Sequence, residues 1–230
     1  MTFADDIRKE VKEIMGTTFT ERAGTKVPEP EDVKLGNDAV TLDGTVLYAD
    51  LAESTNMVNN FENWFAAKVY KSFLLSACRV IRNLDGTITA FDGDRVMAVF
   101  IGDGKNSAAG KAALQINWNK TMINEEIKAK YPDTKYVLKH VVGVDTSPLF
   151  VARTGIRGSN DLVWVGRSAN YAAKLSNFDN GYSSLITKDV YDKLNEASQI
   201  GSNGNNMWTA LTWSEFNMTI YGSTWNWKPA

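Results

Sequence analysis

Two aspartates stand where a short apolar segment of the chain meets a turn. Asp50 closes the segment Thr45-Val-Leu-Tyr-Ala-Asp50, and Asp94 lies in Phe91-Asp-Gly-Asp94-Arg, directly before another apolar run. A carboxylate at the end of a buried strand is costly to desolvate unless positive charge compensates it. We interpret the two aspartates as having no fixed cation beside them in sequence. The compensating charge would then come from a divalent metal. Mg²⁺ is commonly held by one or two carboxylates together with substrate phosphates, which favours a nucleoside triphosphate site.

The composition limits the classes of protein that this chain can belong to. It has 230 residues, 43% of them hydrophobic, which is enough for a sizeable core in one domain. The net charge of −2 provides no basic field for a nucleic-acid partner. One cysteine, Cys78, excludes an internal disulfide framework and fits a reducing compartment. Without an apolar leader or a run of roughly 20 apolar residues, the prediction is a cytoplasmic protein with no membrane insertion.

Hydrophobic periodicity predicts the elements that must position the two aspartates. Helices are expected over residues 3–15, 61–82, 106–129 and 168–175. Strands are expected over residues 45–51, 88–91, 95–101, 136–144, 149–153 and 162–165, with a strand–helix step at 185–186 and a terminal hairpin over 208–221. Asp92-Gly93 predicts a tight hairpin turn. Residues 149–153 are expected to pair with 136–144 across Ser147-Pro148, followed by a polar loop over 155–160.

The order strand, helix, hairpin, helix, strand is the ferredoxin-like β-α-β-β-α-β plan, an α+β fold elaborated at both ends. We expect an N-terminal helix and connector over residues 1–40 and a single domain over 41–230. The first central strand and the hairpin then lie side by side in one antiparallel sheet. This topology would bring Asp50 and Asp94 to the same place.

Three segments resemble, in order, the motifs of the class III nucleotidyl cyclases. The first is Tyr48-Ala-Asp50-Leu-Ala-Glu-Ser-Thr55, and the second is Phe91-Asp-Gly-Asp94-Arg-Val-Met-Ala-Val-Phe100. The third is Gly166-Arg-Ser-Ala-Asn170-Tyr-Ala-Ala-Lys174-Leu. Each match alone is weak, but together they span more than half of the chain. The resemblance implies a class III cyclase catalytic domain.

The resemblance also implies a two-metal reaction. Asp50, Asp94 and the Leu51 carbonyl would hold two Mg²⁺ or Mn²⁺ ions, one favouring deprotonation of the ribose 3′-OH and the other neutralising the triphosphate. The 3′-oxygen would attack the α-phosphorus in line, giving a 3′,5′-cyclic monophosphate and pyrophosphate. The backbone N–H groups placed to contact phosphate oxygens are those of Ala52, Glu53, Ser54 and Thr55.

The third motif departs from the family at its catalytic cation. Asn170 is expected to orient the ribose, as the resemblance implies. Lys174 stands where the family has a transition-state arginine, and lysine keeps the charge but loses the planar fork. Either Lys174 is sufficient, or Arg153, Arg157 or Arg167 supplies the missing donor.

The positions that contact the base depart from the purine-specific members. Ala90 stands where purine cyclases of this class carry a lysine or glutamate, and Val163 stands where they carry an aspartate, threonine or cysteine. Neither side chain can hydrogen-bond to a purine edge, and a site without the required partner discriminates strongly against that base. Tyr48 brings a phenol beside the metal site, and Trp164 fills volume. A pyrimidine would fit better.

This combination is similar to the bacterial Pycsar anti-phage cyclases, class III relatives that make cyclic UMP or cyclic CMP. The similar segments are Asp94–Ile101, Ala152–Gly166 and Trp225-Asn-Trp227. The resemblance implies a homodimer with interfacial sites, in which one subunit provides the metal ligands and the other provides Asn170, Lys174, Val163 and Trp164. It also implies a product that is sensed by a separate, commonly membrane-disrupting, effector protein.

UTP is the first choice of substrate and CTP the second. An adenylate cyclase with an atypical pocket is a further enzyme alternative. From a different class, the chain could be a nucleotide-sensing pseudo-cyclase that binds without turnover. Lys174 mildly favours that alternative, whereas both aspartates and Asn170 argue against it.

Overall fold

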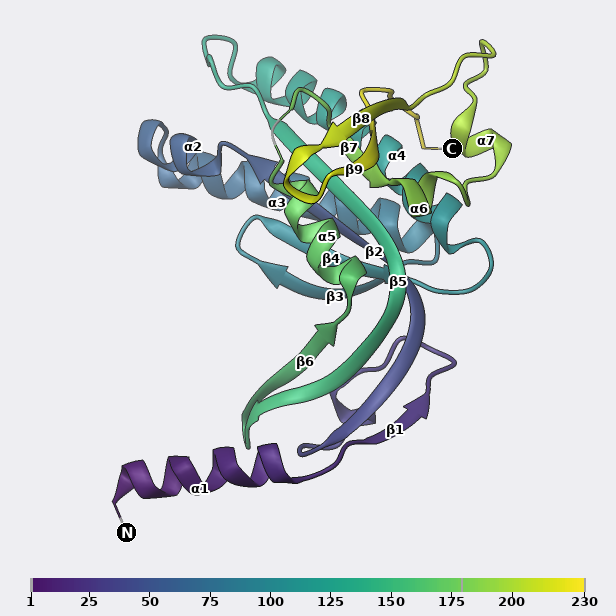
Figure 1. The fold of residues 1–230 in the computed structure, drawn as a ribbon. Helices are drawn as coiled ribbons and strands as arrows, with labels where there is room; N and C mark the ends of the chain where they lie inside the picture. The colour runs from purple at the N-terminus through teal and green to yellow at the C-terminus, as the bar shows by residue number, and fades with distance from the viewer. Residues whose placement is uncertain (1, 179, 230) are drawn as a thin grey trace. The chain divides into compact units, whose positions relative to one another are not determined.

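The computed structural model describes residues 2–178 and 180–229, in which helices and strands are interspersed along the chain (Figure 1). The helices are α1 (Phe3–Gly16), η1 (Pro30–Asp32), α2 (Ser54–Asn60), α3 (Asn63–Asn83), α4 (Lys105–Lys130), α5 (Arg167–Ser176), α6 (Lys188–Tyr191), α7 (Glu196–Gln199) and η2 (Ser214–Phe216). The strands are β1 (Thr20–Ala23), β2 (Asp38–Ala52), β3 (Thr87–Asp92), β4 (Arg95–Phe100), β5 (Lys139–Ile156), β6 (Ser159–Val165), β7 (Ser184–Thr187), β8 (Thr209–Trp213) and β9 (Met218–Ser223).

The sheet confirms the predicted ferredoxin-like plan. Its strand order is β3-β4-β2-β5-β7-β9-β8, with β1 paired to β2 and β6 paired to β5. In β2, Thr45–Asp50 run antiparallel to β4, with Thr45 opposite Phe100 and Asp50 opposite Arg95. The first central strand and the hairpin therefore lie side by side, as expected. β8 and β9 form the predicted terminal hairpin.

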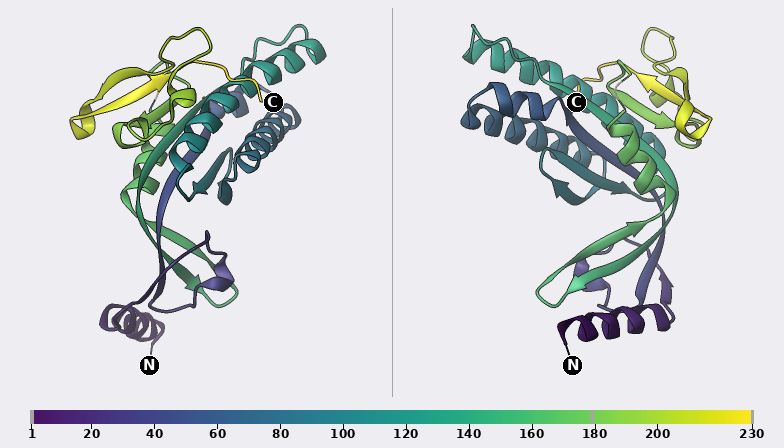
Figure 2. Two further views of the ribbon diagram at one scale, coloured as in Figure 1. Left: turned by 90° about the vertical axis from the view of Figure 1, so that its right-hand side faces the viewer. Right: turned by 60° about the vertical axis from the view of Figure 1, so that its left-hand side comes forward.

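Helices pack on both sides of the sheet, because alternate residues of its strands point to opposite sides. α3 and α4 lie along one face (Figures 1 and 2), where Phe73 and Leu114 pack with Leu47 of β2 in the main core. On the other face, Leu175 of α5 packs with Leu185 and with residues of the terminal hairpin. The residues of β2 that face away from α3 and α4 are therefore on the side of the sheet that carries α5.

Strand β5 corrects the predicted hairpin across Ser147-Pro148. A single strand runs from Lys139 to Ile156 through both residues, so 149–153 do not pair with 136–144. They pair with β6, Val151 opposite Trp164, and the predicted loop at 155–160 is the tip of this hairpin. Proline was interpreted as a turn signal, but a strand accepts it wherever its missing N–H is not needed by the ladder.

Residues 136–138 also differ from the prediction, since β5 begins only at Lys139. Asn124 of α4 replaces strand pairing there: its Oδ1 accepts from Leu138 N at 2.7 Å, and its Nδ2 donates to Leu138 O at 3.1 Å. Strand β2 begins at Asp38, earlier than predicted, and pairs in parallel with the unpredicted β1.

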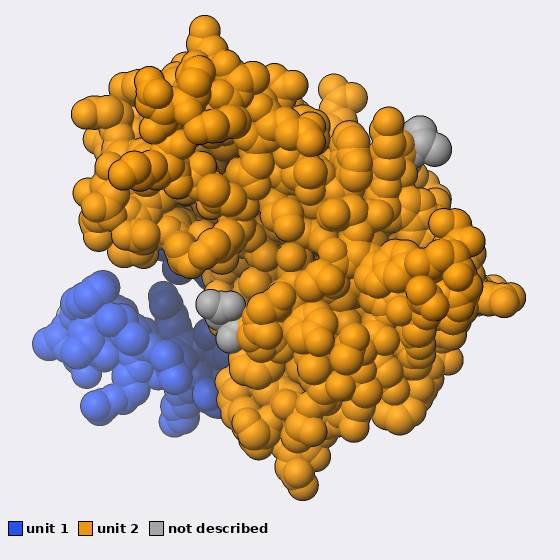
Figure 3. All heavy atoms as spheres, turned by 90° about the horizontal axis from the view of Figure 1, so that it is seen from above, with its two compact units in different colours: residues 1–43, 148–166 blue, residues 44–147, 167–230 orange. Residues whose placement is uncertain are grey.

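The chain divides into two compact units, shown in different colours in Figure 3. One comprises residues 1–43 and 148–166, and the other comprises residues 44–147 and 167–230. Within the first unit, the Phe19 and Phe150 rings pack edge to face at 5.1 Å, and Leu35 forms a β-bridge with Arg153. The second unit contains the main core and both aspartates. The predicted boundary at residue 40 stays a prediction.

Within residues 2–178 and 180–229, no helix is both long enough and apolar enough to cross a membrane.

Gly143 permits the close approach of α5 to β5. A Cβ at this position would lie 2.1 Å from Ala172 O and 2.6 Å from Ser176 N, both backbone atoms that cannot rotate away. We therefore expect Gly143→Ala to lower the free energy of unfolding by about 3 kcal/mol, measured by urea denaturation. Gly16→Ala is the matched control, because a Cβ there meets nothing within 4 Å. A Gly143→Ala chain as stable as the control would contradict this packing.

Candidate active site

Side chains alternate between the two faces of the sheet along strand β2, and this alternation places Asp50 on the face opposite the main core. Leu47, Ala49 and Leu51 belong to the main core, whereas Tyr48 and Asp50 point to the opposite face and are half-buried. A shift of one residue in the β2 register would put the carboxylate into the core. The apolar pattern of β2 thus fixes where Asp50 points.

Asp94 is placed near Asp50 by the tight turn between β3 and β4. Asp92 pairs with Arg95, so the turn residues are Gly93 and Asp94, one position later than predicted. Gly93 has φ +61°, a left-handed conformation that glycine adopts without strain, and a positive φ at the first turn residue is a feature of hairpin turns. Asp94 therefore lies in the loop itself, where its carboxylate is not constrained by strand pairing.

The structure brings the predicted metal and phosphate residues together in one pocket of about 610 Å³. Its lining contains Asp50, Leu51, Ala52, Glu53, Ser54, Thr55, Asp92, Gly93, Asp94, Arg95, Val141, Ser176 and Asn177. Glu53 precedes α2 and has φ +58°, which is strained for a residue other than glycine. This conformation turns the chain sharply from β2 into α2, whose first N–H groups have no intrahelical acceptor.

Two cross-strand rows of side chains border this pocket. The β2–β4–β3 register places Asp50 opposite Arg95 and Arg95 opposite Asp92. Two residues before Asp50 on β2, Tyr48 is opposite Met97 of β4, which is opposite Ala90 of β3. Directly opposed residues share a face of the sheet. The predicted base-contacting positions Tyr48 and Ala90 therefore form a row beside the row that holds Asp50.

The environment of Asp50 is short of positive charge. Burial, and then the neighbouring Asp94 carboxylate, raise the pKa of Asp50 to about 6, and Arg95 opposes this shift only in part. Arg95 Nη1 lies 4.0 Å from Asp50 Oδ2, at the outer limit of an ion pair, while its Nη2 donates to Asp92 Oδ2 at 2.8 Å. Arg95 corrects our premise that no fixed cation stands beside the aspartates, because it directly follows Asp94.

The pocket fits a divalent metal even with Arg95 in place. Asp94 Oδ2 is buried, and no hydrogen-bond partner reaches it among the residues that the structure describes. An ionised carboxylate in that position needs a cation. In the same described ranges, no cluster of three or more histidine, cysteine, aspartate or glutamate side chains forms a metal cage. Two carboxylates with open positions for water and phosphate are the ligand set that Mg²⁺ commonly has.

The third motif lies on α5, which is anchored by an ion pair between the buried Asp145 and the exposed Arg167. Asp145 of β5 is fully buried and accepts from Arg167 Nε at 3.0 Å and Nη2 at 3.2 Å. Thr187 Oγ1 donates to the same carboxylate, and Arg167 also donates to the Thr146 carbonyl at 2.9 Å. Bidentate charged hydrogen bonds fix direction as well as position. They hold the first turn of α5, which carries Asn170.

Asn170 and Lys174 are exposed on α5 and do not line the pocket around Asp50. Lys174 Nζ pairs with Glu215 Oε1 at 2.5 Å and lies 5.2 Å from the centre of the Phe216 ring. Exposed ion pairs of this kind contribute little and exchange readily. Lys174 is thus held in place by a contact that a phosphate could displace.

The three arginines that could replace the family's catalytic arginine differ in their contacts. Arg167 is committed to Asp145, and Arg153 Nε donates to Asn160 Oδ1 at 2.7 Å. Arg157 is exposed at the tip of the β5–β6 hairpin. Val163 and Trp164 lie on β6 of the same unit, with Val163 39% exposed. None of these residues lines the pocket around Asp50.

Sequence reasoning missed several residues of the pocket. Arg95 was visible beside Asp94, but its position opposite Asp50 follows only from the hairpin register. Ser176 and Asn177, at the end of α5, line the pocket although no motif marks them. Tyr70 of α3 does not line the pocket, but it forms a side-chain hydrogen bond with Ser54, which does, and its pKa is raised by burial and by the Asp94 carboxylate.

The fold is shared with solved nucleotide cyclases. The chain is similar to a bacterial light-regulated adenylyl cyclase, with a TM-score of 0.68 and 18% identity over 80% of this chain and 90% of that one. An adenylyl cyclase from P. aeruginosa gives 0.66 and 20% identity over 80% and 95%. A guanylate cyclase domain from Catenaria anguillulae in complex with GTP gives 0.62 and 15% identity over 81% and 99%. The fold is therefore that of the class III cyclase catalytic domain.

Relatives with similar sequences show which family of nucleotide cyclases the chain belongs to. The chain is 46% identical over 231 residues to a uridylate cyclase of Xanthomonas perforans and 49% identical over 229 residues to one of Burkholderia cepacia, covering 99% of each chain in both cases. A uridylate cyclase of Rhodovulum sp. (strain MB263) is 42% identical over 237 residues, covering 100% of this chain and 99% of the relative. No protein-family model matches the chain. The protein is a nucleotide cyclase and belongs to the family of these uridylate cyclases.

The raised pKa of Asp50 makes the stability of the metal-free protein depend on pH. Asp50 binds its proton more tightly in the folded than in the unfolded chain. The contribution of protonated Asp50 to the free energy of unfolding is therefore complete below the unfolded pKa of about 4. It is lost as the pH rises through about 6. We expect Asp50→Asn to raise the melting temperature at pH 8 by a few degrees and to have almost no effect at pH 4. Thermal unfolding in a chelator across this range measures the difference.

Asp92→Asn provides the control, since its side chain is 79% exposed and already paired with Arg95. It should bring no gain in melting temperature at pH 8. An Asp50→Asn effect of the same size at every pH would contradict the electrostatic account.

Proposed function

We propose that the protein converts UTP into 3′,5′-cyclic UMP and pyrophosphate. The observation that carries the proposal is its near full-length identity of 42–49% to relatives named uridylate cyclases. The pocket in which Asp50 and Asp94 meet supports the same reaction. CTP stays the second substrate, because the side chains near the base subsite do not separate a pyrimidine O4 from an N4 amino group.

Asp50, Asp94 and the Leu51 carbonyl are the proposed ligands of the metal ions. Two Mg²⁺ or Mn²⁺ ions per site, when bound, supply Lewis-acid chemistry that favours loss of the 3′-OH proton and neutralises the triphosphate. Binding requires Asp50 to give up its proton, so metal affinity should weaken as the pH falls below about 6. Arg95 limits the repulsion between the carboxylates before the ions arrive.

The residues that follow Asp50 are the proposed phosphate contacts. Ala52, Glu53, Ser54 and Thr55 line the same pocket, and the left-handed Glu53 starts α2 at its edge. Backbone N–H groups in the first helical turn favour anionic oxygens. Positioning and charge neutralisation account for most of phosphoryl-transfer catalysis, so this cradle would hold the α-phosphorus in line with the 3′-oxygen.

Tyr48 is the proposed base-selecting residue. It lies in the row beside Asp50, and its ring centre is 5.5 Å from the Arg95 guanidinium carbon. Ala90, two strands away in this row, leaves space and offers no polar side chain. Val163 and Trp164 would close the site from the other subunit. This combination favours a smaller base with a polar edge over a purine.

The proposed active form is a homodimer with two composite sites. Asn170 and Lys174 are exposed rather than directed into the pocket of Asp50, which supports their acting on a nucleotide held by a second subunit. Asn170 would orient the ribose and Lys174 would neutralise charge in the transition state. Arg157 is the proposed additional donor, because Arg153 and Arg167 already have partners.

The proposed biological role is anti-phage defence in the cytoplasm. The cyclic nucleotide would be sensed by a separate effector protein. A nucleotide-sensing pseudo-cyclase is the alternative from another class, and turnover distinguishes it.

Incubating the purified protein with each of the four nucleoside triphosphates and Mn²⁺ tests the substrate. We expect cyclic UMP as the main product, at least about 10-fold above any other cyclic nucleotide, with pyrophosphate released in equal amount. Mass spectrometry of the nucleotides measures both products. If cyclic CMP is the main product, the protein is a cytidylate cyclase and not a uridylate cyclase. If cyclic AMP is the only product, the argument for a pyrimidine substrate is wrong. Tight UTP binding without pyrophosphate release would favour the sensor.

Asp50→Ala tests the metal ligands. Removing one of two carboxylates should lower the rate of cyclic nucleotide formation by more than about 100-fold while leaving the circular dichroism spectrum unchanged, because losing even an indirect contact to a metal ligand costs 10–100-fold. Asp92→Ala, which removes the exposed carboxylate of the same pocket, should keep most of the activity. Full activity of Asp50→Ala would exclude the proposed site.

A further inference from the structure

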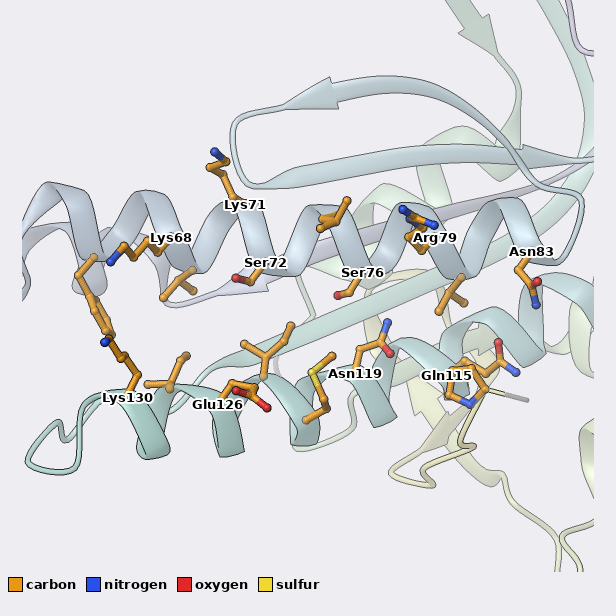
Figure 4. Close-up of a pocket in the computed structure, with 18 of the residues that line it drawn as sticks. Lys68, Lys71, Ser72, Ser76, Arg79, Asn83, Gln115, Asn119, Glu126 and Lys130 are labelled. Carbon is orange, nitrogen blue, oxygen red and sulfur yellow. The ribbon is translucent and has the colours of Figure 1, made fainter.

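A groove between α3 and α4 has no role in the proposed reaction. Its volume is about 1520 Å³, more than twice that of the pocket around Asp50. Small-molecule sites typically occupy roughly 300–1,000 Å³. Figure 4 shows the two helices side by side, with side chains from both entering the space between them. Its size and elongated shape suit a polypeptide segment better than a metabolite.

The floor of the groove combines apolar surface with an unsatisfied amide. Leu75 of α3 lines the groove and is 64% exposed, and the lining also contains the buried Val69 and Ile123. Gln115 of α4 is only 2% exposed, yet its Oε1 has no hydrogen-bond partner in the described part of the chain. Asn119, one turn further on, points toward α3 in Figure 4. The side chain that an occupant would cover is Leu75, which the chain itself leaves exposed.

The α3 wall of the groove is positively charged. α3 contributes Lys68, Lys71, Arg79 and Arg82 and contains no acidic residue, although the whole chain has a net charge of −2. Lys68 donates to the Tyr131 hydroxyl at 3.0 Å. The opposite wall, on α4, carries Glu126 and Lys130. An occupant should therefore present acidic residues to α3.

Helix α1 has the surface that such an occupant needs. Its stripe of Phe3, Ile7, Val11, Ile14 and Met15 is 46–83% exposed, so its own unit leaves the apolar face open. The helix is nevertheless well defined. Thr2 and Asp5 form a capping box at its start, and Asn37 Nδ2 donates to the Ile14 carbonyl at 3.0 Å near its end. A formed amphipathic helix with an uncovered apolar face indicates an interaction site.

The flanks of α1 match the two walls of the groove in charge. Asp6, Glu10 and Glu13 follow one flank of the apolar stripe at helical spacing, and Arg8 and Lys12 follow the other. The 14 residues of α1 span about 21 Å, and the 21 residues of α3 span about 31 Å. The groove is therefore long enough to take the whole helix, with its acidic flank along α3 and its basic flank toward Glu126.

We propose that α1 of a second copy of this chain docks in the α3–α4 groove, with its apolar stripe against Leu75 and its acidic flank along Lys71, Arg79 and Arg82. This is the helix-in-groove mode of recognition, in which apolar anchors provide contact and flanking charges set the orientation. It joins copies through a contact that is separate from the pocket of Asp50. The contact requires neither nucleotide nor metal.

Disulfide formation between two full-length chains of different mass tests the contact. In a Cys78→Ser background, one chain carries Ile14→Cys and the other carries Leu75→Cys. We expect mild oxidation to link the two different chains, because Ile14 and Leu75 face each other in the docked complex. Arg79→Glu in the Leu75→Cys chain should lower the yield several-fold, since it places a carboxylate against the acidic flank.

Lys9→Cys is the matched control, because Lys9 lies on the face of α1 opposite the apolar stripe. It should link at least about 10-fold less than Ile14→Cys. Equal linkage from both positions would overturn the proposal, as would linkage confined to a single chain. A preference of Ile14→Cys chains for one another would show that α1 pairs with α1, which also overturns it.

Discussion

Two like charges meet where β2 faces the β3–β4 turn, and the proposed chemistry of this protein depends on that meeting. The β2–β4 pairing fixes Asp50, and the Gly93–Asp94 turn fixes its neighbour. Asp50 cannot move away without disturbing a ladder whose opposite face is the main core, whereas Asp94 is placed by the turn and not by strand pairing. The raised pKa of Asp50 measures the unfavourable charge, with burial as the larger cause and Asp94 as the second. The fold therefore leaves uncompensated negative charge at this site, which a substrate-bound metal would neutralise.

Arg95 shows why this demand is only partly met within the chain. A cation close to both carboxylates would neutralise them and leave little affinity for metal. Arg95 is instead drawn toward the exposed Asp92 at 2.8 Å and stays 4.0 Å from Asp50. The three side chains lie in one cross-strand row, so their spacing is set by the sheet. Arg95 limits repulsion in the free protein, and no partner for Asp94 Oδ2 is found among the described residues.

The parts of the fold that follow local rules were predictable from sequence. Alternation in β2 and the Asp-Gly turn predicted the meeting of Asp50 and Asp94, and helical spacing predicted α3 and α4. The continuous course of β5 through Pro148 was not predictable, because whether a strand tolerates proline depends on which ladder positions need an N–H. Likewise, the parallel pairing of β1 with β2 is a long-range contact without a periodic signal.

The anchoring of α5 shows a second limit of sequence reasoning. Asp145 and Arg167 are distant in the chain, and neither falls in a pattern that marks an ion pair to a buried carboxylate. Only the fold reveals that Asp145 is fully buried and gathers donors from Arg167 and Thr187. Removing one partner of such a pair is expensive, whereas the pair itself contributes direction more than stability. The sequence motif identifies Asn170 and Lys174, but the buried charge determines how the helix presents them.

The separation between α5 and the carboxylate pocket favours an assembly in which each copy completes the other. Asn170 and Lys174 lie on the same side of the sheet as Asp50, yet they are exposed and do not line its pocket. Lys174 is paired with Glu215, a half-exposed partner that a phosphate could displace. A nucleotide held by Asp50 and Asp94 of one copy and met by α5 of another would neutralise charge from both sides. Catalysis would then depend on association of the chains, and a monomer would hold the triphosphate without the groups that stabilise its transition state.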